Sequence, residues 1–170
     1  MKGDTIPLHA ANQALGGGFI SRLNMELRGG KGWSYGVSGY ETLREKGANY
    51  VVAAPVQADR TGDALAELNR LVAGFLTSEG VTQAERDRTV AKSISELPGE
   101  FETAGSVISA LMRMDLLDRP DDFYETLPAK YRSLTPASLN QAIRGAIDPR
   151  GFTWIVVGDA AKVRPQLEKL

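Results

Sequence analysis

Residues 15 to 35 read Leu15-Gly-Gly-Gly-Phe-Ile-Ser-Arg-Leu-Asn-Met-Glu-Leu-Arg-Gly-Gly-Lys-Gly-Trp-Ser-Tyr35. Between the two groups of glycines, the apolar side chains recur at the spacing of one helix face. Gly29 and Gly30 follow the last apolar residue of that pattern and indicate where the helix ends. From Trp33 the period changes to the alternation that is typical of a strand. The stretch therefore predicts a helix, a glycine-rich loop and a strand in succession.

Amphipathic patterns on both sides of this stretch predict the other elements. A first helix runs from Ile6 to Leu15 and ends at Gly16–Gly18. Two antiparallel strands are expected at about 34–43 and 48–57, joined by the charged turn Leu43-Arg-Glu-Lys-Gly47. The remaining helices are expected from Thr61 to a stop at Gly80, from the capping box Thr82–Glu85 toward Leu97, at about 101–117, from Asp121, from Thr135–Pro136 and over Ala160–Leu170.

A short apolar run, Phe152–Val157, predicts one more strand, buried and ending before Gly158–Asp159. The sequence thus predicts an α+β fold in which a small antiparallel sheet packs against several helices. Its 170 residues suffice for one domain, spanning 1–170. Three strands are few for so many helices. We therefore expect the first strands of the domain to precede Met1, which would make the chain a fragment of a longer protein.

The composition excludes several classes of partner. Twenty basic and 21 acidic side chains give a formal charge of −1, so no global field attracts nucleic acid. The aromatic residues are scattered rather than interleaved with Arg or Lys, which also argues against a nucleic-acid platform. No apolar run approaches the roughly 20 residues that a membrane span needs. Cysteine is absent, which excludes disulfides and thiolate chemistry and leaves the compartment unknown.

The chain lacks the residues of an autonomous hydrolase. His9 is its single histidine. A catalytic zinc site needs about three protein ligands, and serine or cysteine nucleophiles need a histidine base. We therefore predict no catalytic residue and no metal ligand in this chain, and interpret His9 as a residue at the helix surface or core edge. An unrelated enzyme that uses paired carboxylates stays an alternative, although most acidic residues lie beside Arg or Lys at surface spacing, as in Glu85–Arg88.

The glycines Gly16, Gly17 and Gly18 do not make a phosphate loop. A helix rather than a strand precedes them, and no Gly-Lys-Ser/Thr ending follows. They are interpreted as a tight break between two helices.

Arg28 and Tyr35 are the pair with the clearest chemical potential. Arg28 lies at the end of a helix and Tyr35 at the start of a strand, with a glycine loop between them that can turn back. Their polar tips can then point to the same side, where a guanidinium and a phenol suit the carbonyl oxygens of an extended peptide. The alternative is that Arg28 caps the carbonyls of its own helix while Tyr35 packs at the rim of the sheet.

This stretch resembles the non-catalytic domain of the pitrilysin/insulinase family of zinc metallopeptidases, the inverzincins, which includes mitochondrial processing peptidase. The positions that match the family pattern are Leu15–Gly17, Ser21–Leu23, Leu27–Arg28, Lys31–Gly32 and Ser34–Tyr35. The resemblance continues through Gly47, Val81–Glu85, Lys92 and the closing strand before Gly158. Gly29–Gly30 replaces the usual charged pair of the family, and Trp33 stands where an aliphatic residue is commoner. Both departures affect the loop between Arg28 and Tyr35.

The resemblance implies a division of labour. Family members form a closed chamber from two halves of similar fold, of which one carries the zinc motif and the other contacts the substrate. Arg28 and Tyr35 would bind the peptide backbone, and Gly16, Gly17 and Gly18 would line the chamber. Zinc, absent as a cofactor from this chain, is expected in a partner domain or subunit, and a periplasmic location is possible by family likeness. The alternative is a structural or assembly domain of the same fold with no peptidase role.

Overall fold

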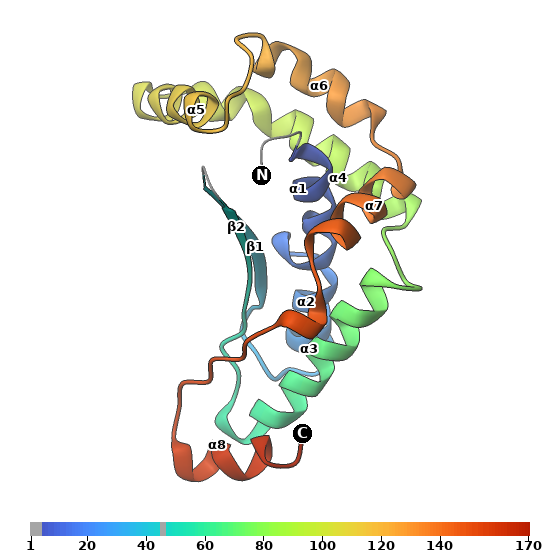
Figure 1. Cartoon of the computed structure of the whole chain (residues 1–170), viewed down its shortest axis with the longest axis vertical. Helices are drawn as coiled ribbons and strands as arrows, with labels where there is room; N and C mark the ends of the chain where they lie inside the picture. The colour runs from blue at the N-terminus through green and yellow to red at the C-terminus, as the bar shows by residue number, and fades with distance from the viewer. Residues whose placement is uncertain (1–4, 45–46) are drawn as a thin grey trace.

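The computed structural model describes residues 5–44 and 47–170 (Figure 1). Its first helix, α1 (Ile6–Asn12), continues into a π-helical turn at Gln13–Gly17. The second, α2 (Arg22–Asn24), likewise continues into a π-helical turn at Met25–Gly30. Both predicted helices are thus confirmed, because apolar side chains at helical spacing place one face of each against the core. π-helical turns are rare and often mark functional sites.

The two strands form an antiparallel hairpin, β1 (Ser38–Arg44) and β2 (Gly47–Ala53), in which Tyr40 pairs with Val51. An isolated bridge between Ser34 and Val56 extends the pairing toward the predicted strand limits. The two strands predicted at 34–43 and 48–57 are therefore confirmed in shortened form. Part of the predicted charged turn, Glu45 and Lys46, lies outside the described residues.

Helices make up most of the rest of the chain. They are α3 (Thr61–Leu76), α4 (Gln83–Glu96), α5 (Ala104–Leu116), α6 (Phe123–Ser133), α7 (Pro136–Ala146) and α8 (Ala160–Leu167). The predicted capping box is present, since the Thr82 hydroxyl accepts from the Glu85 backbone N–H. With its two-stranded antiparallel sheet, this architecture is the predicted α+β fold. Within the described ranges, no helix is long and apolar enough to cross a membrane.

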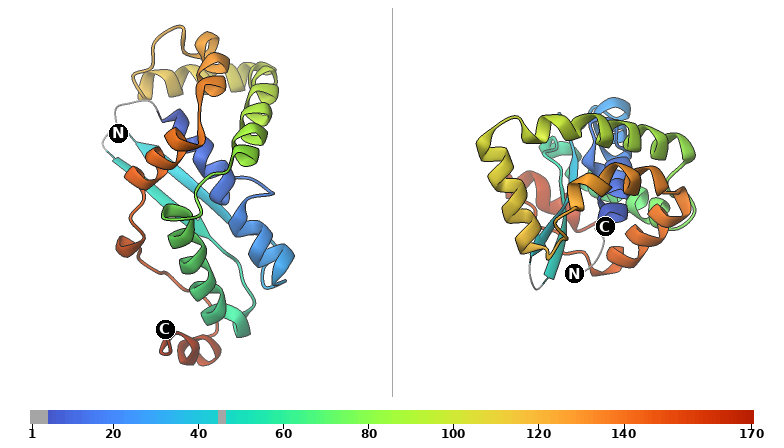
Figure 2. Two further views of the ribbon diagram at one scale, coloured as in Figure 1. Left: turned by 90° about the vertical axis from the view of Figure 1, so that its right-hand side faces the viewer. Right: turned by 90° about the horizontal axis from the view of Figure 1, so that it is seen from above.

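One face of the hairpin is covered by α1, α2 and α3, while its other face is open (Figure 1). A second direction of view shows α3 beside the hairpin, with α5 and α6 at one end of the molecule and α8 at the other (Figure 2). The core lies between the hairpin and the helices. Its largest fully buried apolar side chains are Phe75, Leu15, Leu23, Leu27, Leu139, Ile143 and Val72.

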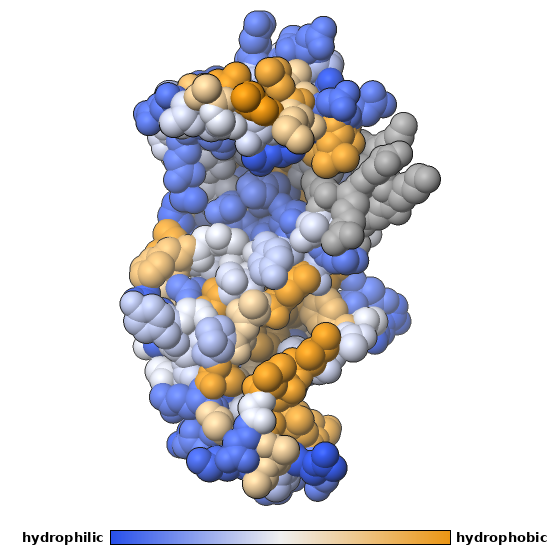
Figure 3. Space-filling model, turned by 90° about the vertical axis from the view of Figure 1, so that its left-hand side faces the viewer, coloured by the Kyte–Doolittle hydropathy of each residue, from blue (hydrophilic) through white to orange (hydrophobic). Residues whose placement is uncertain are grey.

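The open face of the hairpin carries exposed apolar side chains. Tyr40 and Val51 point away from the helices, and Figure 3 shows apolar residues gathered over the lower half of this side. The buried strand predicted at Phe152–Val157 is wrong. This segment has no regular secondary structure, and Ile155 and Val157 are 86% and 94% exposed. A strand needs a neighbour to satisfy its backbone hydrogen bonds, and none of the described residues supplies one to this segment.

Candidate functional site

The glycine turn brings α1 into direct contact with the hairpin. Gly16 is buried, and a Cβ atom placed on it would lie 2.8 Å from the backbone nitrogen of Gly39 in β1. No side chain fits at that distance, so Gly16 allows the helix and the strand to pack backbone to backbone. Gly17 is exposed and Gly18 half-buried. The predicted break between two helices is therefore present, with Gly16 in a packing role.

The loop that follows α2 folds back over the end of its own helix. The backbone N–H groups of Trp33 and Ser34 both donate to the carbonyl oxygen of Leu27, at 2.9 and 3.3 Å. Gly32 has a φ of +65°, in the left-handed region that favours glycine. Trp33, one of the two departures from the family pattern, packs against the core. These contacts fix the loop, and Tyr35 emerges next to Arg28.

The Asn24 side chain links the turn that precedes α2 to the segment that follows Tyr35. Its side chain is almost completely buried, donates to the carbonyl oxygen of Phe19 at 2.5 Å and accepts from the backbone N–H of Val37 at 2.9 Å. Phe19 precedes α2, whereas Val37 follows Tyr35. One buried amide therefore sets the separation of the two segments on either side of Arg28.

Arg28 lies between two aromatic rings. Its Cζ atom is 4.5 Å from the ring centroid of Phe19 and 5.6 Å from that of Tyr35. Both rings are well exposed, at 69% for Phe19 and 90% for Tyr35. The alternative placement from the sequence, with Tyr35 packed at the sheet rim, is not what the structure has. The predicted proximity of Arg28 and Tyr35 is present.

The polar atoms of this pair have no partner among the described residues. Within residues 5–44 and 47–170, no hydrogen bond or ion pair engages the Arg28 guanidinium or the Tyr35 hydroxyl. The N–H donors of a guanidinium lie in its own plane, so contact with ring faces leaves them open. The arrangement can therefore present several donors to carbonyl or carboxylate oxygens. It contains no base or nucleophile.

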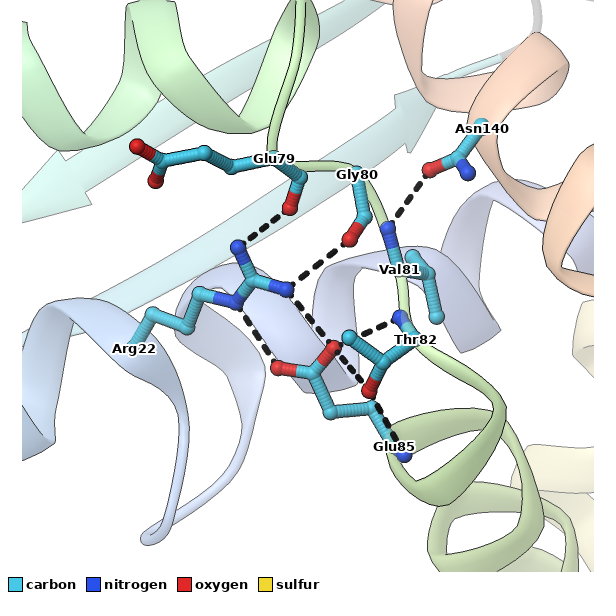
Figure 4. A network of polar contacts seen from close by, with 7 residues as sticks. All are labelled: Arg22, Glu79, Gly80, Val81, Thr82, Glu85 and Asn140. Carbon is cyan, nitrogen blue, oxygen red and sulfur yellow. Dashed lines mark hydrogen bonds and ion pairs between the residues drawn. The ribbon is translucent and has the colours of Figure 1, made fainter.

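Arg22, on the same helix, has the opposite environment (Figure 4). Its guanidinium donates to both carboxylate oxygens of Glu85, at 2.7 and 2.8 Å, and to the carbonyl oxygens of Glu79 and Gly80. Its Cζ atom also lies 4.9 Å from the ring centroid of Phe75. Arg22 thus joins α2 to the loop between α3 and α4 and has a structural role.

The capping box of α4 takes part in the same network. The Glu85 carboxylate accepts from the backbone N–H of Thr82 at 2.8 Å as well as from Arg22. Burial raises the pKa of Glu85, but the hydrogen bonds from Arg22 and Thr82 outweigh burial and hold that pKa below its ordinary value. The hydrogen bond to Glu85 raises the pKa of Arg22. Both groups are therefore held in their charged forms.

A separate polar cluster surrounds His9. Its Nδ1 atom lies 2.5 Å from a carboxylate oxygen of Glu41, Asn12 donates to the other oxygen at 2.9 Å, and the Tyr50 hydroxyl donates to Asn12 at 2.8 Å. Burial raises the pKa of Glu41, but the interactions with His9 and Asn12 lower it by more. The pKa of Glu41 therefore lies below its ordinary value. Burial and the Glu41 charge raise the pKa of Tyr50. His9 therefore lies at the edge of the core, as interpreted from the sequence.

This cluster lines a cavity of about 580 Å³ that also contacts Lys92 and Phe123. Neither Arg28 nor Tyr35 lines it. His9, Asn12 and Glu41 bind one another in its wall, whereas the buried Oε1 atom of Gln13 has no hydrogen-bond partner among the described residues. In the part of the chain that the structure describes, no three His, Asp or Glu side chains lie together as metal ligands would.

Two residues of the site, Phe19 and Asn24, were missed from the sequence. Both belong to the stretch from Leu15 to Tyr35, but their roles depend on contacts with Arg28 and Val37. A polar Asn among the apolar residues of a short helix was the available signal for Asn24, and an apolar residue directly after three glycines was the signal for Phe19.

The chain matches one family of known proteins. The sequence pattern of the family described as Peptidase M16 inactive domain matches residues 2–93, which is more than half of the chain. Among curated proteins, none matches.

Solved structures show the same fold. The chain is similar to a peptidase M16 inactive domain from Pseudomonas fluorescens, with 21% identity and a TM-score of 0.78 over 87% of this chain and 35% of that one. It is also similar to a protease from Helicobacter pylori, with 18% identity and a TM-score of 0.67 over 84% of this chain and 34% of the other. A Bordetella pertussis protein, named provisionally as a zinc protease, is 20% identical, with a TM-score of 0.63 over 82% of this chain and 76% of its own. The chain spans about a third of the length of the first two proteins.

Proposed function

The chain belongs to the peptidase M16 family as one of its inactive domains, and on this premise we propose that it holds the backbone of a peptide substrate. The resemblance to the pitrilysin/insulinase peptidases is confirmed by that membership. The zinc ion and the base that activates water would belong to a partner domain or subunit, facing this one across a chamber. The work of this chain would be to bind and orient the peptide.

The observation that carries this proposal is the state of Arg28. It is half-buried between the rings of Phe19 and Tyr35, yet its donors are unengaged among the described residues. Arg22, on the same helical segment, instead has its donors engaged by a carboxylate and two carbonyl oxygens. Free donors beside an exposed phenol suit successive carbonyl oxygens of an extended chain.

The same donors would act in two ways during cleavage by the zinc-bearing half. They would restrict the peptide to one orientation, which lowers the entropic barrier to attack. They would also stabilise negative charge as it develops on a carbonyl oxygen nearby. Gly17 and Gly18, which lack side chains at the surface, would let the peptide backbone approach this end of the site, and the buried Gly16 would support them.

The test is cleavage of a peptide by this chain combined with its zinc-bearing half. Arg28→Ala and Tyr35→Phe should each lower kcat/KM, by roughly 10- to 100-fold for Arg28→Ala if one charged hydrogen bond is lost. Zinc content should not change. Arg150→Ala is the matched control, because Arg150 is a highly exposed arginine paired with Asp148.

Full activity in both variants would overturn the proposal. A structural or assembly domain of the same fold predicts that outcome, together with loss of assembly when other surfaces are changed. Binding of the peptide to the 170-residue chain alone provides a second measurement, and it should weaken in the same two variants.

A further inference from the structure

Phe19 is an exposed aromatic residue that the packing of the core does not require. It lies in the turn between Gly18 and Ser21, where the backbone N–H of Ser21 donates to the carbonyl oxygen of Gly18 at 3.0 Å. An exposed turn usually carries small or polar residues, yet this ring is 69% exposed. Among the described residues, the charged group it contacts is Arg28, whose Cζ atom lies 4.5 Å from the ring centroid. The ring thus contributes little to the core.

We infer that Phe19 is a positioning residue for Arg28, and that its free ring face receives a bulky apolar side chain of the bound peptide. This inference rests on the proposed function, because it assigns a role at the same site. It adds a residue to the site and names a substrate class, peptides with an apolar side chain next to the bound carbonyl.

Arg28 needs such a support. A long arginine side chain without a hydrogen-bond partner loses rotamer freedom when a ligand binds, and this loss of entropy weakens binding. Stacking on an aromatic ring restricts the guanidinium before the ligand arrives and leaves its in-plane donors open. Phe19 lies closer to the guanidinium than Tyr35 does, at 4.5 against 5.6 Å. Phe19 is therefore the main support.

The position of Phe19 is fixed by the backbone. Its carbonyl oxygen accepts from the buried Asn24, which also holds Val37. This hydrogen bond holds the backbone from which the exposed ring reaches Arg28. Ile20 and Met25, each 49% exposed, flank Phe19 and Arg28 in sequence and add apolar surface. A peptide whose carbonyl reaches Arg28 would place an adjacent side chain near this surface, and an apolar side chain would gain most from it.

The test compares Phe19→Leu, which keeps apolar bulk but removes the ring, with Phe19→Tyr, which keeps the ring. NMR of the Arg28 Nε–H group in the chain without peptide should show greater side-chain mobility in Phe19→Leu and wild-type behaviour in Phe19→Tyr. KM for cleavage by this chain with its zinc-bearing half should rise about two- to fivefold in Phe19→Leu, while kcat changes less. Peptides with glycine beside the bound carbonyl should show a smaller rise, because for them only the positioning of Arg28 depends on the ring.

Phe101→Leu is the control, because Phe101 is an exposed ring that packs on Tyr124 instead of an arginine. Unchanged Arg28 mobility and unchanged KM in Phe19→Leu would overturn the inference, even if Arg28→Ala still lowers cleavage. If Arg28 mobility rises in Phe19→Leu but Arg28→Ala leaves cleavage intact, the proposed function fails while the support of Arg28 by Phe19 stands.

Discussion

Arg22 and Arg28 lie six residues apart on one continuous helical segment, and their surroundings differ in nearly every respect. Arg22 is saturated with a carboxylate and two carbonyl oxygens from the loop that joins α3 to α4. Arg28 is held by ring faces alone among the described residues. One arginine therefore joins the helix to the rest of the fold, whereas the donors of the other have no partner among the described residues.

The difference follows from where each side chain points. Arg22 faces the loop between α3 and α4, where the carbonyl oxygens of Glu79 and Gly80 accept its N–H groups. Arg28 lies at the exposed end of the segment, beside the turn of Phe19 and the loop that carries Tyr35. Among the described residues, the saturation of hydrogen-bonding capacity thus distinguishes the structural Arg22 from Arg28, for which we propose a binding role.

Arg22→Ala should lower the free energy of unfolding by roughly 3 kcal/mol, because the partly buried Glu85 carboxylate and two carbonyl oxygens would lose their charged donor. Urea unfolding followed by circular dichroism measures this change. Arg28→Ala is the matched comparison and should alter the same free energy by no more than about 0.5 kcal/mol. Equal losses of unfolding free energy in the two variants would show that Arg22 and Arg28 contribute equally to stability.

Asn24→Ala should lower the free energy of unfolding by roughly 2 kcal/mol, because the carbonyl oxygen of Phe19 and the N–H group of Val37 would lose their buried partner. It should also weaken peptide binding, since the segments on both sides of Arg28 would separate. Asn69→Ala on α3, an exposed site, is the control. Loss of stability with unchanged binding would leave Asn24 a purely structural role.

Glu85 should make stability depend on acid pH. Its pKa is lowered by folding, so its contribution is complete above its ordinary value of 4.5 and is lost as the pH falls through the lowered pKa. Glu85→Gln should remove this part of the pH dependence. The unfolding free energies of the two proteins should diverge over this pH range by less than about 1 kcal/mol, because the carboxyl group is partly solvated. Unfolding free energies measured from pH 6 to pH 3 test this. Parallel curves for the two proteins would contradict it.

Much of the fold was predictable, because helices depend on nearby residues. The apolar spacing around Leu15 and Leu27, and the capping box from Thr82 to Glu85, predicted helices that the structure contains. The segment at Phe152–Val157 was mispredicted because a strand depends on distant residues. Its apolar run is suited to a strand, but a strand exists only where a neighbour provides hydrogen bonds.

The candidate site also has a part that the sequence predicts and a part that depends on tertiary contacts. Arg28 and Tyr35 were predictable from a glycine loop that can turn back and from a family pattern. Their aromatic support was not, since Phe19 reaches Arg28 only through the turn that Asn24 fixes. The structural role of Arg22 was equally hidden, because its partner Glu85 lies 63 residues further along the chain.

The sequence by itself determined the helices, the hairpin, the family and the arginine–tyrosine pair, because these depend on local spacing and short motifs. Tertiary structure alone decided which arginine is saturated and which is free, that Gly16 packs against Gly39, and that residues 152–157 lie exposed. These outcomes depend on contacts between distant segments. The energy of a polar group is set by the partners that folding brings to it, and no local pattern contains them.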